Sequence, residues 1–100
     1  MGARIKVPRK RVGEFCRRNR IRRLSLFGSV LRDDFRPDSD VDVLVEFKQG
    51  ARVELLTLAG MEIELRRILK RTVGMNTGRS LSPYYRDQVL AEAEVLYEQT

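Results

Sequence analysis

Residues 40–47 constrain the fold of this chain more than any other segment. They read Asp-Val-Asp-Val-Leu-Val-Glu-Phe, with an apolar residue at every second position. Alternate residues of a β-strand point to opposite faces of a sheet. The apolar set that begins at Val41 is therefore predicted to pack on helices. The other set places Asp40 and Asp42 together on a more open face.

The rest of the chain alternates between predicted helices and strands. Helices are predicted at residues 8–19, 30–35, 53–70 and 82–93, and further strands at 22–27, 72–77 and 95–97. The apolar residues available for burial in the longest helix are Leu55, Leu56, Ala59, Ile63, Ile68 and Leu69. The first two strands are joined by a link too short for a usual parallel crossover, so we expect them to be antiparallel. The predicted fold class is α/β (α+β), a small mixed sheet of three to four strands with helices packed on one face.

The length and composition exclude several classes of protein. With 100 residues there is room for one core, so residues 1–100 are predicted to form a single domain. No apolar stretch approaches the roughly 20 residues that span a bilayer, and no hydrophobic signal segment is found, so the default expectation is a cytoplasmic protein. Cys16 is the only cysteine and there is no histidine, which excludes an internal disulfide and histidine-based chemistry. Cys16 is expected to be a small buried hydrophobe.

Positive charge is concentrated near the N-terminus. The formal net charge is +6, and residues 1–23 hold ten of the twenty Lys and Arg with only one acid, Glu14. A basic end of this kind suits a phosphate-bearing partner, whether a nucleotide, a nucleic acid or an acidic protein. A solvated helix face is the equally weighted alternative.

The Gly28-Ser29 turn and the two aspartates together could form a site that binds phosphate and a metal ion. Residues i and i+2 of a strand lie about 6.5–7 Å apart on one face, where two carboxylates repel by roughly 2.4 kcal/mol at an effective dielectric of about 20. A magnesium ion between them would remove that cost. Glycine lets the backbone approach a phosphate closely, and free N–H groups at a helix start attract anions. A plain turn with solvated aspartates is the alternative interpretation of these residues.

Gly28-Ser29 followed by Asp40-Val41-Asp42 resembles the signature of the DNA polymerase beta-like nucleotidyltransferase superfamily. The longer run from Leu26 to Phe47 looks like the minimal nucleotidyltransferases, small stand-alone proteins called MNT domains. The resemblance implies the nucleotidyltransferase fold and the magnesium-dependent transfer of a nucleoside monophosphate, often AMP from ATP, to an acceptor. The roles it implies are catalysis and magnesium binding for Asp40 and Asp42, triphosphate binding for Gly28 and Ser29, and phosphate contact for Arg32 and Arg36, unless these arginines are solvent-exposed loop charges.

The resemblance also implies a partner, and this chain departs from the family pattern at one position. Such proteins often pair with a helical HEPN-domain protein, in some cases as the antitoxin that adenylylates a toxin. The family commonly has a third carboxylate on its third strand, but here Gly74 occupies that position. Glu46, Glu62 or Asp87 could substitute for it, and the sequence does not place them.

Three hypotheses follow from these residues. The first is an active nucleotidyltransferase, and the second is a catalytically impaired relative that binds nucleotide or a HEPN-type partner. The third is a small basic nucleic-acid-binding module. Against this third hypothesis, the chain has no aromatic base-stacking platform of the kind that single-strand binders use. The nucleotide base, the acceptor and any homo-oligomer are not specified by the sequence. Because so short a chain leaves its site open, we expect the acceptor or a partner to supply the missing walls.

Overall fold

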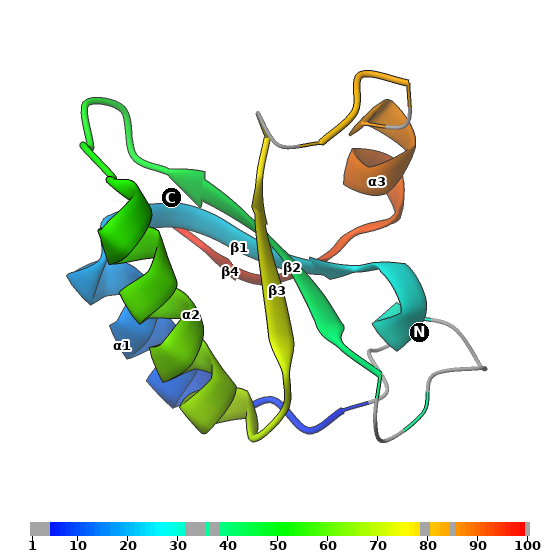
Figure 1. The fold of residues 1–100 in the computed structure, drawn as a ribbon, viewed down its shortest axis with the longest axis horizontal. Helices are drawn as coiled ribbons and strands as arrows, with labels where there is room; N and C mark the ends of the chain where they lie inside the picture. The colour runs from blue at the N-terminus through cyan, green and yellow to red at the C-terminus, as the bar shows by residue number, and fades with distance from the viewer. Residues whose placement is uncertain (1–4, 32–35, 37–38, 79–80, 85, 100) are drawn as a thin grey trace.

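The computed structural model describes residues 5–31, 36, 39–78, 81–84 and 86–99 (Figure 1). Its elements are, in order, α1 (Arg9–Arg18), β1 (Ile21–Phe27), the 3₁₀ helix η1 (Gly28–Leu31), β2 (Val41–Phe47), α2 (Leu55–Leu69), β3 (Val73–Thr77), α3 (Arg86–Glu92) and β4 (Glu94–Glu98). The predicted alternation of helices and strands is confirmed. The short helix predicted at 30–35 lies partly outside the described residues, and its described part belongs to η1.

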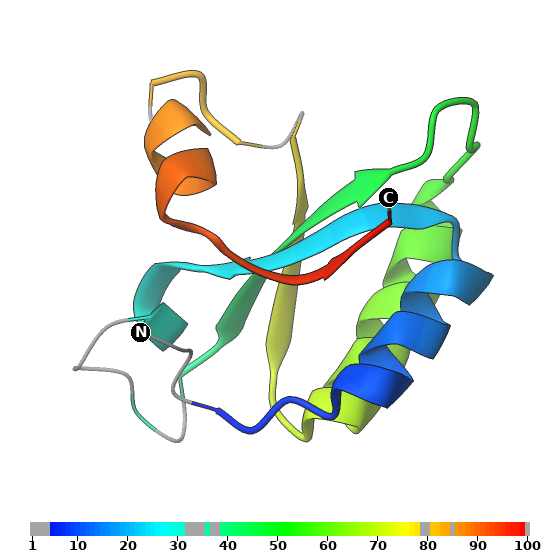
Figure 2. The ribbon, with the colours of Figure 1, turned by 180° about the vertical axis from the view of Figure 1, so that it is seen from behind.

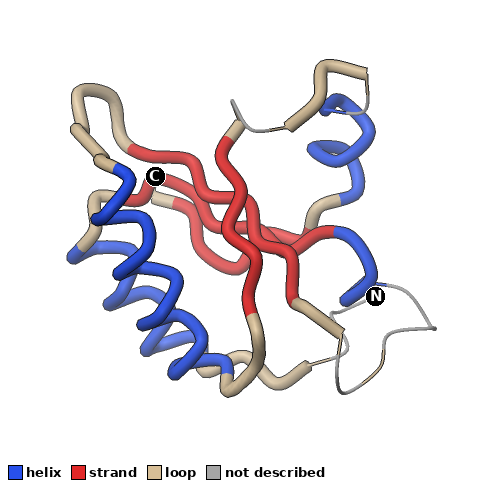
Figure 3. Tube along the Cα trace, viewed as in Figure 1, coloured by secondary structure: helices blue, strands red, loops and turns tan. Residues whose placement is uncertain are grey.

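The four strands form one mixed sheet in the order β3-β2-β1-β4 (Figure 3). β1 pairs antiparallel with both β2 and β4, whereas β2 and β3 are parallel. The antiparallel pairing expected from the short link between the first two strands is therefore confirmed. The parallel pair is joined through α2, the connection that a parallel crossover requires.

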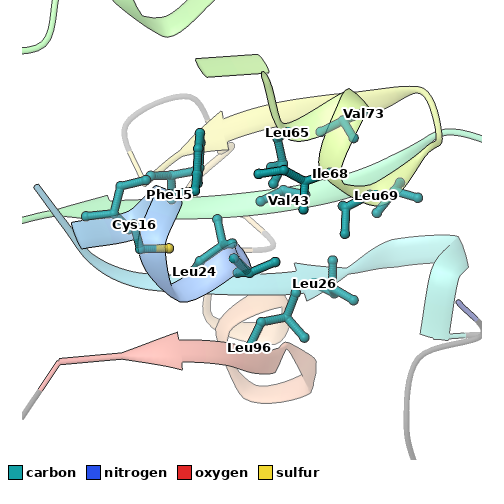
Figure 4. Close-up of a cluster of buried hydrophobic side chains, with 14 of the residues drawn as sticks. Phe15, Cys16, Leu24, Leu26, Val43, Leu65, Ile68, Leu69, Val73 and Leu96 are labelled. Carbon is teal, nitrogen blue, oxygen red and sulfur yellow. The ribbon is translucent and has the colours of Figure 1, made fainter. Parts of the chain in front are cut away.

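Helices α1 and α2 lie side by side and cover one face of the sheet (Figures 1 and 2). Val41, Val43 and Val45 of β2 are at most 1% exposed and belong to the core beneath these helices. Figure 4 shows side chains of α1 and α2 converging on those of the sheet, among them Phe15 and Leu65. The apolar face predicted for β2 is confirmed. Helix α3 lies apart from α1 and α2 and contains no fully buried residue (Figure 1).

The predicted buried face of α2 is wrong in part. Leu55, Leu56 and Ile63 are 82%, 85% and 52% exposed, and Ala59 is exposed as well. The residues that α2 buries are Met61, Leu65, Ile68 and Leu69. Apolar residues occur on two sides of this helix, and a helix on a sheet buries only one stripe. Packing of α2 against α1 and β3 selects the stripe, and only Ile68 and Leu69 of the predicted set belong to it.

Cys16 is fully buried in the core, as the sequence predicted. Burial raises the pKa of its thiol to about 12, and the nearby charge of Arg17 only partly offsets this effect. The thiolate is therefore scarce at neutral pH, which is typical of a structural cysteine. Among the described residues, no helix has the length and apolarity needed to cross a membrane.

Candidate active site

Gly28 lies at the junction of β1 and η1, where the backbone turns away from the sheet. Its φ of +78° falls in the left-handed region that favours glycine. A β-carbon built on this residue would lie 2.6 Å from Oδ2 of Asp42. The preceding residue, Phe27, is the register partner of Asp42 across the antiparallel ladder. The turn therefore packs directly against the carboxylate of Asp42, and a larger residue would displace that carboxylate.

Asp40 and Asp42 lie at the start of β2, beside this turn. Asp40 precedes the strand and is exposed, whereas Asp42 lies within it and is half-buried. Burial, and secondly the negative charge of Asp40, raise the pKa of Asp42. The two carboxylates are thus close enough to interact, on the side of β2 away from the core valines. This matches the arrangement expected from their spacing in the sequence.

Gly74 of β3 lies next to Asp42 on the other side of β2. The two residues are partners in the parallel ladder, and a β-carbon on Gly74 would lie 3.5 Å from Oδ1 of Asp42. That distance is an ordinary van der Waals contact, so a side chain at position 74 would have room and would begin beside the carboxylate. The position at which a third acid was expected is therefore adjacent to Asp42, and in this chain it provides only backbone.

None of the three proposed substitutes joins the aspartates. Glu46 lies at the far end of β2, where it forms 2.8 Å ion pairs with Arg22 and Arg23. Glu62 lies on α2 and pairs with Arg66, and Asp87 is exposed on α3. Among the residues that the structure describes, no group of three or more His, Cys, Asp and Glu could hold a metal ion. Glu46 is held in ion pairs at the other end of β2, and neither Glu62 nor Asp87 joins the aspartates in such a group.

Of the remaining predicted site residues, the structure describes Ser29 and Arg36. Ser29 belongs to η1, directly after the glycine turn. Arg36 is exposed, and its N–H donates to Oγ of Ser39 at 3.2 Å, while its carbonyl accepts from the Ser39 N–H at 3.0 Å. These bonds join Arg36 to Ser39, the residue before Asp40. Arg32 lies outside the described residues.

Asn76 is not among the predicted site residues, although it lies two residues after Gly74 and therefore on the same side of β3. Its Nδ2 donates to the carbonyl oxygen of Gly74 at 3.2 Å, so its amide lies beside the carbonyl edge of that residue. Asn76 is half-buried and pairs with Leu44 in the parallel ladder. The period of two on the third strand would have identified it once Gly74 was placed.

Comparisons with known proteins agree on one family. The model of the nucleotidyltransferase domain family matches residues 9–96. A candidate protein adenylyltransferase of Methanocaldococcus jannaschii is 38% identical over 73 residues, which cover 73% of this chain and 76% of that protein.

Solved structures of related proteins have the same fold. A candidate minimal nucleotidyltransferase is 40% identical, with a TM-score of 0.70 and coverage of 85% of each chain. A complex of a tri-AMPylated Shewanella oneidensis HEPN toxin with its MNT antitoxin contains a chain that is 20% identical, with a TM-score of 0.65. That match covers 91% of this chain and 70% of the other.

Proposed function

This chain belongs to the nucleotidyltransferase domain family, and we propose that it acts as one domain, residues 1–100, that transfers AMP from ATP to an acceptor. The observation that carries the proposal is the contact between the Gly28 turn and the carboxylate of Asp42. Phosphate-binding turns need closely approaching backbone, and metal-bound phosphates need carboxylates beside them. In this chain the two features occupy adjoining positions.

The two carboxylates fit a magnesium ion. Burial and the neighbouring charge of Asp40 raise the pKa of Asp42, so the site disfavours two negative charges without a cation. Magnesium prefers oxygen ligands and is usually held by one or two carboxylates together with water and substrate phosphates. Asp40 and Asp42 are the residues that would hold it. When bound, magnesium would neutralise phosphate charge and help to align the triphosphate.

The remaining residues would position the nucleotide. Backbone N–H groups after Gly28, with Ser29, would bind the triphosphate, and Arg32 and Arg36 would supply positive charge from the following segment. The acceptor hydroxyl oxygen would form a bond to the α-phosphorus as the bond to the bridging α–β oxygen breaks. Pyrophosphate then leaves with its electron pair, and the hydroxyl proton passes to solvent.

We propose a HEPN-type helical protein as the acceptor. In the Shewanella oneidensis complex, the HEPN toxin carries AMP and is bound to an MNT antitoxin. The chain described here would be the antitoxin of such a pair. Its site opens beside Asp40 and Arg36, which are both exposed, so a partner protein has access to the carboxylates.

A second candidate function is favoured by Gly74. A third acid commonly helps to activate the attacking hydroxyl through a second metal ion, and here the ladder position beside Asp42 has no side chain. The chain could then bind nucleotide with magnesium, or hold its partner, without efficient turnover. The two candidate functions share the same nucleotide site and differ in whether AMP is transferred.

A labelling experiment separates the candidates. The protein is incubated with α-labelled ATP, magnesium and a HEPN-type partner, and transfer of label to protein is measured. Asp42→Asn is the matched control because it keeps the shape of the side chain and removes its charge. Label on the partner that is lost in the control supports the transferase. Magnesium-dependent ATP binding without transfer would overturn the transferase and support the impaired relative. No ATP binding would overturn the transferase and the nucleotide-binding form of the impaired relative.

A further inference from the structure

The segment before α1 passes the C-terminal end of α2 (Figures 1 and 2). A cavity lies between them, and neither Asp40 nor Asp42 lines it. Its volume is about 660 Å³, which is within the usual range for sites that bind small molecules. Val7 and Leu69 contribute apolar surface to it. The cavity is formed by two segments far apart in the sequence, so folding is needed to create it.

The rim of this cavity is strongly basic. Lys6 and Arg11 approach from the N-terminal side, and Lys70 and Arg71 from the end of α2. Lys6, Arg11 and Lys70 have no ion-pair partner among the described residues. None of the described residues that line the cavity is acidic. It therefore combines several uncompensated cations with an apolar floor.

The dipole of α2 does not cancel this charge. A helix C-terminus carries about half a negative charge, and Lys70 donates its N–H to the carbonyl of Arg66 there, which satisfies part of that end. Lys6, Arg11 and Lys70 each carry a full positive charge, which exceeds the partial negative charge of the helix end. The charges of the described lining residues therefore sum to a positive value, and an anion of several charges would gain most from them.

The conformation of Lys70 adds a further observation. Its φ of 56° and ψ of 39° place it in the left-handed region at the helix C-cap, where glycine is usual. A lysine in that conformation costs about 1 kcal/mol relative to glycine. The same turn thus places a cation at the cavity, at a position where glycine would be more stable.

The cavity is separate from the candidate active site. Its basic residues belong to the segment before α1, to α1 and to the end of α2, whereas Asp42 lies on β2, on the side opposite the core valines. Val41 and Val73, both at most 1% exposed, lie in the core between them. The two regions come nearest in the chain where the Val41 N–H, next to Asp40, donates to the carbonyl of Thr72, next to Arg71, at 2.8 Å.

We propose that this cavity is a second, metal-independent binding site for a phosphate-bearing ligand of several negative charges, such as a nucleoside polyphosphate or the backbone of a single-stranded RNA. The cations would contact the phosphates, and the apolar floor would contact the organic part. The proposal does not depend on the transferase activity, because it involves neither the aspartates nor magnesium.

The test uses the full chain in EDTA, which removes magnesium from the nucleotide site. Binding of three probes, tripolyphosphate, ATP and a short single-stranded RNA, is measured by calorimetry, and the site is mapped by amide NMR shifts. Lys70→Gly removes one cavity cation and relieves its backbone strain. Arg20→Gly is the matched control, because Arg20 is exposed, has the same φ of 56° and does not line the cavity.

We expect shifts at residues 6–11 and 68–71 and affinity about five-fold weaker in Lys70→Gly, with a change below about two-fold in Arg20→Gly. The Asp40→Asn/Asp42→Asn variant should bind as the wild type does, which separates this site from the nucleotide site. Tighter binding of RNA than of ATP would identify the polymer as the source of the phosphates, and the reverse would identify the free nucleotide. Equal weakening by the two glycine variants, or no binding of any probe, would overturn the proposal.

Discussion

Gly74 and Asp42 are partners across the parallel β2–β3 ladder, and a β-carbon on Gly74 would lie 3.5 Å from Oδ1 of Asp42. An aspartate at position 74 would therefore begin within van der Waals contact of the existing carboxylate and could reach a metal ion held there. This relationship makes the absence of a third acid testable by a single substitution.

We predict that Gly74→Asp raises the rate of AMP transfer about ten-fold, which corresponds to roughly 1.4 kcal/mol of transition-state stabilisation. Transfer of label from α-labelled ATP measures it. Gly78→Asp is the matched control, because it adds the same charge just beyond β3, at a glycine with nothing within 4 Å of a built β-carbon. An unchanged rate in Gly74→Asp would mean that another group already fills the role.

We predict that Gly28→Ala destabilises the fold by about 1–3 kcal/mol and abolishes binding of magnesium–ATP. The alanine would have to adopt a φ of +78° with its β-carbon 2.6 Å from Oδ2 of Asp42. Gly50→Ala separates the backbone strain from the contact with Asp42. Gly50 has a similar φ of +84°, but a β-carbon built on it has nothing within 4 Å. Urea denaturation should show a smaller loss of stability in Gly50→Ala than in Gly28→Ala, and Gly50→Ala should still bind magnesium–ATP. Similar losses in the two variants would mean that the contact with Asp42 is unimportant.

Part of this site could be predicted from the sequence because strand periodicity is simple. The alternation in β2 placed Asp42 and the core valines on opposite sides of the strand, and the structure agrees. The roles of Glu46 and Glu62 could not be predicted, because they depend on ion pairs with arginines distant in sequence or on the orientation of a helix. The local sequence pattern predicts which face of a strand a residue lies on, whereas tertiary contacts decide which acids are held in ion pairs.

Helix α2 illustrates the same limit. Its apolar residues form two stripes, and periodicity alone does not distinguish a stripe on the sheet from one in solvent. We predict that Leu65→Ala costs about 2–5 kcal/mol, since Leu65 is fully buried, and that Leu56→Ala costs less than about 0.5 kcal/mol, since Leu56 is 85% exposed. Chemical denaturation of the two variants measures both values. A loss at Leu56 as large as that at Leu65 would contradict the orientation of α2.

The raised pKa of Asp42 predicts a pH-dependent effect on stability. Because burial and Asp40 make ionisation of Asp42 harder in the folded state, its contribution to stability is most favourable below the pKa of the unfolded chain and is lost as the pH rises through the folded pKa. Without divalent ions at pH 7, Asp42→Asn should therefore raise the melting temperature by about 2–5 °C.

That gain should shrink as the pH falls through the folded pKa of Asp42. At pH 7 it should also shrink when magnesium is added, because a bound cation stabilises only the wild-type carboxylate. Thermal melts over a pH series, with and without magnesium, provide the measurement. A variant less stable than the wild type at pH 7 without metal would show that Asp42 gains more from its surroundings than it loses by burial.

Cys16 should be unreactive until the chain unfolds. Its side chain is fully buried, and burial raises the pKa of the thiol to about 12, so both access and thiolate formation oppose modification. A thiol reagent at pH 8 should label it at least about 100-fold more slowly in the native protein than in denaturant, with opening of the core as the limiting step. Cys16→Ser should cost about 1–3 kcal/mol, because a hydroxyl would replace the sulfur in an apolar core, and Cys16→Ala should cost less. Equal labelling rates in native buffer and in denaturant would show that α1 does not protect this position.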